Sequence, residues 1–285
     1  MKIFYSPEYA VDSDLETVSK SRVIARMISE GQVPGVELAP SKPASRNELL
    51  QVHDAAYVDS VLSGSIGRLA AGDWSPELLR SILFSTGGMR DAVLEALQSG
   101  CAGCLASGQH HAKRNRGFAL CTINGIALAA IEALKHVRSV GVLDLDAHFG
   151  GGTFAILGSD ERVHLSDVSV EDLDHWTPTD LSRHHRVEIK EPAKYLPAVR
   201  RALKRLESVD FLIYYAGMDP HENAGGIPGI TTPMLQKRDR IVAAWCRNKR
   251  MPVIFAPAGG YTEQMSLEEL ATLHLDTVRA FAEAR

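Results

Sequence analysis

The sequence predicts an α/β protein with one domain over residues 1–285, built on a mostly parallel, open β-sheet that carries helices on both faces. Apolar runs of strand length alternate with longer amphipathic segments, which is the pattern of successive strand–helix units. The apolar runs are continuous, as expected for parallel strands buried on both faces. The chain shows no internal repeat and no linker rich in Pro, Gly or Ser. Its 285 residues therefore suit one large domain.

The expected strands begin with the apolar start of the chain at residues 1–7. The other expected strands are the apolar runs that end at Leu105, Asp146, Ser166, Asp219 and Ala256. Amphipathic periodicity predicts helices over residues 122–135, 193–206, 234–248 and 267–284. The last of these has Ser266 as its N-cap and Glu269 in the capping-box position. The polar stretch 167–191, with its clustered Asp and His residues, is expected to form a surface loop near the strand ends.

The composition predicts a cytoplasmic protein and excludes several classes of partner. The net charge of −4 and the isoelectric point of about 6.3 give no electrostatic basis for binding nucleic acid or membrane surfaces. No apolar run approaches the length of a membrane span, and the first residues become polar too soon for a signal peptide. The four cysteines are few for this length, as in the reducing cytoplasm. Cys101 and Cys104 form a lone C-x-x-C motif, and we expect them to be small buried residues.

Carboxylates and a histidine stand at the ends of two expected strands. Asp144, Asp146 and His148 follow one apolar run and precede three consecutive glycines, and Asp219 follows another run. Residues two apart in a strand face the same way, and open parallel sheets bind ligands at the carboxyl ends of their strands. Adjacent carboxylates in a protein core need a cation to neutralise them. Because two carboxylates and one imidazole leave a coordination position open, the pattern predicts a catalytic zinc site.

Two further segments carry candidate catalytic groups. His110 and His111 are consecutive, so their side chains point differently and suit proton transfer better than joint binding of one metal. After the expected strand that ends at Ala256, Gly259 lets the backbone approach a site closely, and the Tyr261 hydroxyl offers a hydrogen-bond donor.

In these motifs the sequence resembles the histone deacetylase and acetylpolyamine amidohydrolase family. The resemblance extends from about Tyr5 to about Phe281, and its motifs occur in the family's order and at family-like spacing. The matching segments are residues 108–112 (GQHHA), 117–118 (GF) leading into Asn124, 144–148 (DLDAH), 150–153 (GGGT), 216–219 (AGMD) and 259–261 (GGY).

The resemblance implies the arginase–deacetylase fold and a set of roles around one catalytic Zn²⁺. The implied activity removes an acetyl or other short acyl group from an N-acylated amine. The three zinc ligands would be Asp146, His148 and Asp219. His110 and His111 would be the paired general acid/base histidines that flank the attacking water. Asp144 would orient His110 and share in a structural K⁺ site.

The same resemblance implies how the substrate is held. Tyr261 would donate a hydrogen bond to the substrate carbonyl, Phe118 would line the narrow tunnel for the acylated side chain, and Gly259 would lie against the substrate. The expected substrate is an acetylated polyamine, another small acylated amine, or an acetyl-lysine side chain. The chain would act as a monomer or small homo-oligomer.

Two residues depart from the family pattern beside the expected zinc ligands. Phe149 stands where the family has a second histidine, and Gly151 stands where it has an Asp or Asn that supports a catalytic histidine. We therefore expect His111 to lack an orienting carboxylate, which would leave its tautomer less defined. These departures keep open a catalytically weak, zinc-containing protein that binds acyl ligands. A binuclear manganese enzyme related to ureohydrolases is a further alternative, which Phe149 disfavours because it cannot ligate a metal.

Overall fold

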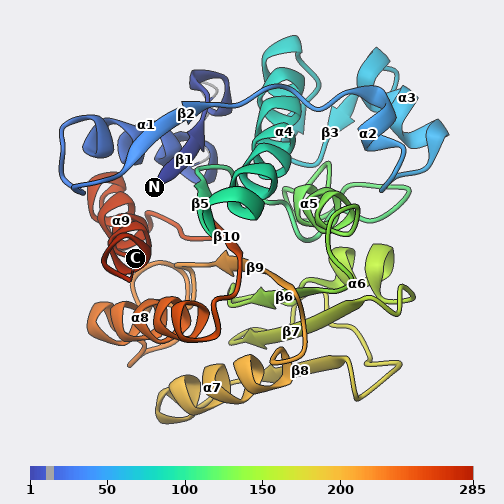
Figure 1. Cartoon of the computed structure of the whole chain (residues 1–285). Helices are drawn as coiled ribbons and strands as arrows, with labels where there is room; N and C mark the ends of the chain where they lie inside the picture. The colour runs from blue at the N-terminus through green and yellow to red at the C-terminus, as the bar shows by residue number, and fades with distance from the viewer. Residues whose placement is uncertain (11–15, 285) are drawn as a thin grey trace.

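The computed structural model describes residues 1–10 and 16–284 and is organised around an eight-stranded sheet in the order β2-β1-β5-β10-β9-β6-β7-β8 (Figure 1). All neighbouring strands in this sheet are parallel. The strands are β1 (Lys2–Tyr5), β2 (Glu37–Pro40), β5 (Cys101–Cys104), β6 (Val140–Asp144), β7 (Val163–Ser169), β8 (His184–Glu188), β9 (Phe211–Ala216) and β10 (Val253–Pro257). A separate antiparallel ribbon pairs β3 (Arg68–Leu69) with β4 (Gly72–Asp73). The expected open parallel sheet is confirmed.

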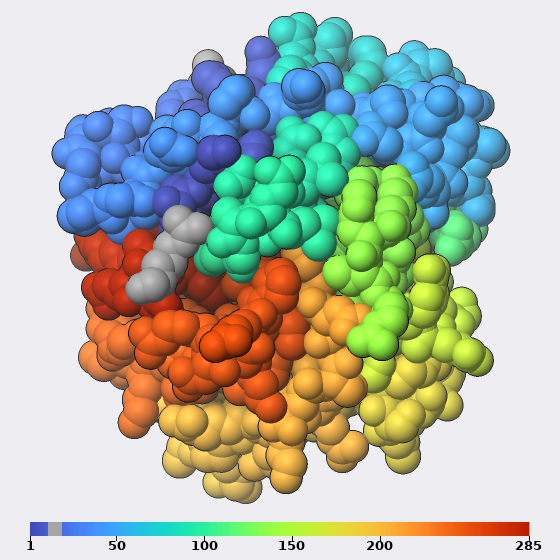
Figure 2. Space-filling view, viewed as in Figure 1, coloured from blue at the N-terminus to red at the C-terminus, as the bar shows by residue number. Residues whose placement is uncertain are grey.

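Helices cover both faces of the sheet, as expected (Figure 1). On one face α4 and α5 pack over the central strands, and on the other α1, α9, α8 and α7 follow one another in a layer. In Figure 2 the blue N-terminal segments meet the red C-terminal helix, because α1 packs against α9. Within the described residues, none of the helices combines the length and hydrophobicity that crossing a bilayer requires. The helices are α1 (Glu16–Ser29), α2 (Arg46–Leu49), α3 (Ala55–Ser63), α4 (Pro76–Ser99), α5 (Gly125–Ala133), α6 (Gly151–Leu157), α7 (Tyr195–Arg205), α8 (Thr232–Lys249) and α9 (Leu267–Glu283), with short 3-10 turns η1 (Pro7–Tyr9) and η2 (Pro192–Lys194).

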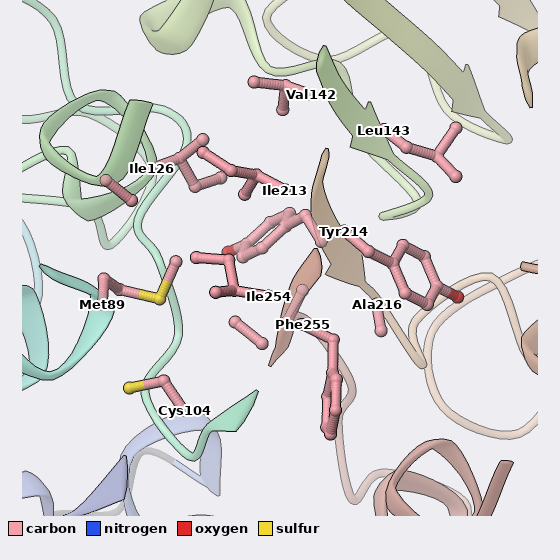
Figure 3. Close-up of a cluster of buried hydrophobic side chains, with 14 of the residues drawn as sticks. Met89, Cys104, Ile126, Val142, Leu143, Ile213, Tyr214, Ala216, Ile254 and Phe255 are labelled. Atoms are coloured by element: carbon pink, nitrogen blue, oxygen red, sulfur yellow. The ribbon is translucent and has the colours of Figure 1, made fainter. Parts of the chain in front are cut away.

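The main core lies between the central strands and these helices. Every residue of β6, β9 and β10 is buried, which explains why these strands are continuous apolar runs in the sequence. Figure 3 shows Leu143 of β6, Ile213 of β9 and Phe255 of β10 within one cluster of buried side chains, together with Met89 of α4 and Ile126 of α5. The strands that lead into the site motifs are therefore buried along their whole length, and only their ends reach the loops.

The elements named from the sequence lie within three residues of their observed positions. The capping box of α9 is present, since Ser266 N donates to Glu269 Oε2 (2.8 Å) and Glu269 N donates to Ser266 Oγ (3.2 Å). The expectation of a loop over 167–191 is wrong in part, because residues 184–188 form β8 at the edge of the sheet. Most of β8 is only half-buried and its sequence is HHRVE, so it lacks the apolar run that revealed the inner strands.

A buried ion pair fixes the chain just beyond β9. Arg238 of α8 is fully buried, donates from Nε to Asp239 Oδ1 (2.8 Å), and donates from Nη1 to the carbonyl oxygen of Gly217 (2.5 Å). Asp239 also accepts hydrogen bonds from the hydroxyls of Tyr214 (2.5 Å) and Thr277 (2.7 Å). Since breaking one side of such a network leaves a buried charge unpaired, the turn at Gly217 is held in one position.

Candidate active site

The loops that follow four neighbouring strands converge at the carboxyl edge of the sheet. They follow β5, β10, β9 and β6, which are adjacent in the sheet, and this edge is where parallel sheets bind ligands. A pocket of about 170 Å³ opens there. Its lining includes seven of the residues singled out in the sequence: His110, His111, Asp146, His148, Asp219, Gly259 and Tyr261.

Asp146, His148 and Asp219 form a compact group of possible metal ligands. One ligand atom from each lies within 4.8 Å of the others. Nδ1 of His148 is 3.0 Å from Asp146 Oδ1 and 3.3 Å from Asp219 Oδ2. Ligand atoms at about 2.0 Å from a tetrahedral Zn²⁺ are separated by about 3.3 Å. Both measured separations are compatible with these three side chains binding one Zn²⁺, while Asp144 lies outside the group.

The charges of this group also fit a bound cation. Within the part of the chain that the structure describes, Oδ2 of Asp219 is buried and accepts no hydrogen bond. Burial and the adjacent Asp146 carboxylate raise the pKa of Asp219. Burial lowers the pKa of His148, but its hydrogen bond to Asp146 and the negative charges of Asp146 and Asp219 outweigh burial and raise this pKa to about 11. The cluster therefore attracts positive charge strongly, as a metal site must.

His110 and His111 face each other beside this group. Their Nε2 atoms are 3.0 Å apart, and His110 Nε2 is 3.6 Å from Asp146 Oδ1. Nδ1 of His110 lies 2.8 Å from Asp144 Oδ2, so Asp144 occupies the orienting place expected for it. Burial and the neighbouring His110 lower the pKa of His111 to about 4, which makes neutral His111 the dominant form at pH 7.

The expectation that His111 lacks an orienting carboxylate is wrong. Nδ1 of His111 lies 3.0 Å from Oδ2 of Asp174, a residue in the loop between β7 and β8. Burial raises the pKa of Asp174, but hydrogen bonds from His111 and Lys113 outweigh it and lower this pKa overall. The sequence contained one indication of this partner, the clustered acidic residues of 167–191, but their separation from His111 concealed the pairing.

Gly259 and Tyr261 bring the loop after β10 into the pocket. The backbone N–H of Gly259 donates to Asp146 Oδ2 (2.9 Å), and a Cβ atom at this position would lie 1.9 Å from Asp219 Oδ2. Glycine is therefore required for this close approach. Burial, followed by the Asp219 and Asp146 charges, raises the pKa of the Tyr261 hydroxyl, which keeps it protonated as a hydrogen-bond donor.

The two phenylalanines singled out in the sequence lie outside the pocket lining. Phe118 is 37% exposed and meets His111 edge-on, with ring centroids 5.9 Å apart. It is not among the described residues that line the pocket, whereas its neighbours Ala119 and Leu120 are. Phe149 is fully buried beneath the guanidinium of Arg186, at 4.9 Å, and so fills core space beside the metal group.

Lys20 is a site-supporting residue that the sequence analysis missed. This α1 side chain is buried, and its Nζ donates to the carbonyl oxygens of Ala258 and Gly259. Burial lowers the pKa of Lys20 to about 8, against the raising effect of the Asp219 and Asp146 charges. Its role is to hold the backbone turn that presents Gly259 to the metal group.

His53, which carried no functional expectation, supports the histidine loop from behind. It is buried, its Nδ1 lies 2.8 Å from the Lys113 carbonyl oxygen, and its Nε2 accepts from Asn124 N (3.0 Å). The ring must be neutral to donate at Nδ1 and accept at Nε2. Burial lowers the pKa of His53 to about 4, compared with about 6.5 in an unfolded chain.

This pKa difference predicts a loss of stability in acid. The unfolded chain binds a proton at His53 as pH falls below about 6.5, whereas the folded chain resists it until about pH 4. Since one pKa unit is worth about 1.4 kcal/mol, the stabilising contribution present at pH 7 falls by about 3 kcal/mol by pH 4. The free energy of unfolding by urea is measured for chelated wild type and chelated His53→Gln from pH 7 to pH 4. The difference between the two proteins should narrow by about 3 kcal/mol over this range. A constant difference across this range would contradict the assignment.

Comparison with known proteins agrees with the geometry. The family model described as the histone deacetylase domain matches residues 15–179. A protein named histone deacetylase 2 from Arabidopsis thaliana is 26% identical over 291 residues, covering 92% of this chain and 74% of that protein. A histone deacetylase-like amidohydrolase from Pseudomonas aeruginosa is 33% identical over 151 residues, covering 48% of this chain and 39% of that protein.

A solved structure shares the whole architecture. The crystal structure of an acetylpolyamine aminohydrolase from Burkholderia pseudomallei superimposes with a TM-score of 0.82, covering 100% of this chain and 98% of that chain at 17% sequence identity. At this identity the likeness establishes the fold, which is thus the arginase–deacetylase fold expected from the sequence.

Proposed function

Because the chain belongs to the histone deacetylase domain family, we propose that it is a zinc-dependent amidohydrolase that removes an acetyl or other short acyl group from an N-acylated amine. One observation carries this proposal: the compact group of three possible metal ligands and a pair of facing histidines line the same pocket. Asp146, His148 and Asp219 would hold the zinc. When bound, Zn²⁺ polarises the substrate carbonyl and lowers the pKa of a nearby water.

His110 and His111 supply the proton transfers of this proposal. Each ring has a carboxylate at Nδ1 and directs its Nε2 toward the other ring. One Nε2 accepts a proton from the attacking water as the new carbon–oxygen bond forms. The pair then returns a proton to the amine nitrogen as the carbon–nitrogen bond breaks, which yields a carboxylic acid and a free amine. General acid–base catalysis of this kind contributes about 10²- to 10⁴-fold.

In this proposal the remaining groups stabilise the charge that develops on the carbonyl oxygen and position the substrate. The protonated Tyr261 hydroxyl donates to the carbonyl oxygen as it gains negative charge, a type of interaction worth about 3 kcal/mol per donor. Gly259 offers backbone contact at the metal group. Phe118 would act at the rim, beside His111, instead of along the inner wall. A structural K⁺ beside Asp144 is part of the same proposal.

The proposed cellular setting follows from the chain as a whole. The four cysteines are free and buried, which suits a reducing cytoplasm. We take residues 1–285 as one catalytic domain that works as a monomer or small homo-oligomer. Its partners in this proposal are acylated amines, acetylpolyamine or acetyl-lysine, and neither nucleic acid nor membrane.

The experiment that tests this function is metal-dependent acyl release. Acetate is measured with a panel of N-acetylated polyamines and acetyl-lysine peptides, using zinc-loaded, chelated and zinc-reloaded protein. We expect hydrolysis with about one zinc per chain, loss on chelation and recovery on reloading. The substrate with the highest kcat/KM then distinguishes polyamine from lysine chemistry.

Other outcomes would replace this proposal. Full activity in metal-free protein would exclude zinc chemistry, and two manganese ions per chain would favour the ureohydrolase-like alternative. Tight hydroxamate binding with no turnover on any substrate would favour a binding protein. The main motivation for that last alternative is removed, because His111 has a carboxylate partner in Asp174.

A further inference from the structure

A side chain at position 151 and the observed position of Asp174 beside His111 exclude each other sterically. A Cβ atom built on Gly151 would lie 2.2 Å from the carbonyl oxygen of Asp174 and 2.7 Å from its Cγ. Real Cβ atoms do not approach other atoms this closely, so position 151 has no room for a side chain while Asp174 stays where it is. The missing side chain at position 151 therefore leaves the space that Asp174 occupies.

The Asp174 carboxylate is buried and fully engaged. Its side chain is 3% exposed. Oδ2 accepts from His111 Nδ1 (3.0 Å) and from the backbone N–H of Gly152 (3.1 Å), and Oδ1 lies 2.8 Å from Lys113 Nζ. The lysine offsets the buried negative charge, since an unpaired carboxylate here would be costly.

The backbone at Asp174 adopts an unusual conformation to deliver this side chain. Its φ of 54° lies in the left-handed region, which costs a non-glycine residue about 1 kcal/mol. The preceding residue is tied to the metal-site loop, because Phe149 N donates to the carbonyl oxygen of Leu173 (3.0 Å). The loop between β7 and β8 is thus anchored directly before Asp174.

The Asp174 carboxylate determines which ring nitrogen of His111 carries the hydrogen. A charged carboxylate only accepts hydrogen bonds, so the hydrogen of neutral His111 must sit on Nδ1. Its Nε2 is then a hydrogen-bond acceptor, 3.0 Å from Nε2 of His110. We propose that Asp174 is a positioning residue that holds His111 in the Nδ1–H tautomer and ring orientation needed for proton transfer. This inference rests on the proposed hydrolase function.

The first test measures the tautomer directly and needs no turnover. In zinc-loaded protein labelled with nitrogen-15 histidine, the His111 signals, assigned with a His111→Ala sample, should show a protonated Nδ1 and an unprotonated Nε2. In Asp174→Asn this preference should be lost. An Nε2–H tautomer in the wild type would overturn the proposal, whether or not the protein hydrolyses amides.

The second test uses kinetics with a matched control. Asp174→Asn keeps the side-chain size and should lower kcat by about 10- to 100-fold, as changes to residues that orient the ligands of a metal site do. KM and zinc content should stay within about threefold of wild type. The control is Asp172→Asn in the same loop, where the side chain is 56% exposed, and it should behave as wild type. An unchanged kcat in Asp174→Asn would overturn the role.

A double variant separates positioning from a merely structural effect. If Asp174 acts through His111, then Asp174→Asn should have no further effect on kcat in a His111→Ala background. Independent, multiplicative losses would assign Asp174 a structural role and contradict the proposal. Gly151→Ala offers a second route, since its Cβ would displace Asp174, and it should reproduce the Asp174→Asn kinetics. Failure of the proposed function is distinguishable, because the wild type would then show no metal-dependent hydrolysis while the tautomer remains measurable.

Discussion

Asp219→Asn is expected to abolish zinc binding and hydrolysis together while leaving the fold intact. The amide oxygen can still accept the hydrogen bond that Ala147 N donates to Asp219 Oδ1 (2.9 Å). What is lost is the anionic Oδ2, which is buried, accepts no hydrogen bond among the described residues, and lies 3.3 Å from His148 Nδ1. Residues that only orient metal ligands cost about 10- to 100-fold in metal affinity or activity when changed. Losing a ligand should exceed that, so we expect kcat/KM to fall by more than about 100-fold.

Zinc titration during thermal unfolding provides the measurement. A ligand that binds only the folded state stabilises it by about 2.7 kcal/mol at 100 times its Kd. Zinc should therefore raise the Tm of the wild type and of Asp172→Asn, whose carboxylate is exposed, but not that of Asp219→Asn. A zinc-dependent rise in Tm and retained hydrolysis in Asp219→Asn would exclude this carboxylate as a ligand.

His111→Ala is expected to give the second large effect, a fall in kcat of about 10²- to 10⁴-fold with zinc still bound. Its Nε2 is 3.0 Å from His110 Nε2, and its ring centroid is 5.8 Å from that of the proposed ligand His148. The ring is thus close enough to share a proton with His110, yet it holds no metal in this proposal. Removing it should damage proton transfer and spare the metal group.

The measurement is kcat and KM together with zinc content for His111→Ala. The control is His175→Ala, where the imidazole is 60% exposed and close to Asp172, and it should match the wild type. Retained wild-type kcat in His111→Ala would remove this histidine from the mechanism. Loss of zinc in proportion to activity would instead place it in the metal site.

Much of the fold was predictable because each inner strand is a short, continuous run of apolar residues. β6 and β9 are buried along their whole length, so hydrophobicity alone marks them. The group of possible metal ligands was predictable too, because Asp146 and His148 follow β6 and Asp219 follows β9. Once two strands are parallel neighbours, the residues just beyond them must meet at one edge.

The sequence was less informative where an element is half-buried or where a contact joins distant segments. β8 escaped prediction because its exposed edge position permits polar residues. In the sequence, Lys20 has the pattern of any helical lysine, and only the packing of α1 brings its Nζ to the carbonyl oxygen of Ala258. Nothing in a helical pattern identifies a partner 238 residues away.

The sequence by itself determined the family, the parallel α/β architecture, and which residues stand at the strand ends, because these depend on local patterns of burial and spacing. The tertiary structure alone decided how His111 is supported. Gly151 suggested a missing carboxylate, yet the loop between β7 and β8 places Asp174 in the space that glycine leaves free. This replacement of the expected carboxylate by Asp174 depends on two distant segments having complementary shapes. Only the packed chain brings those segments together.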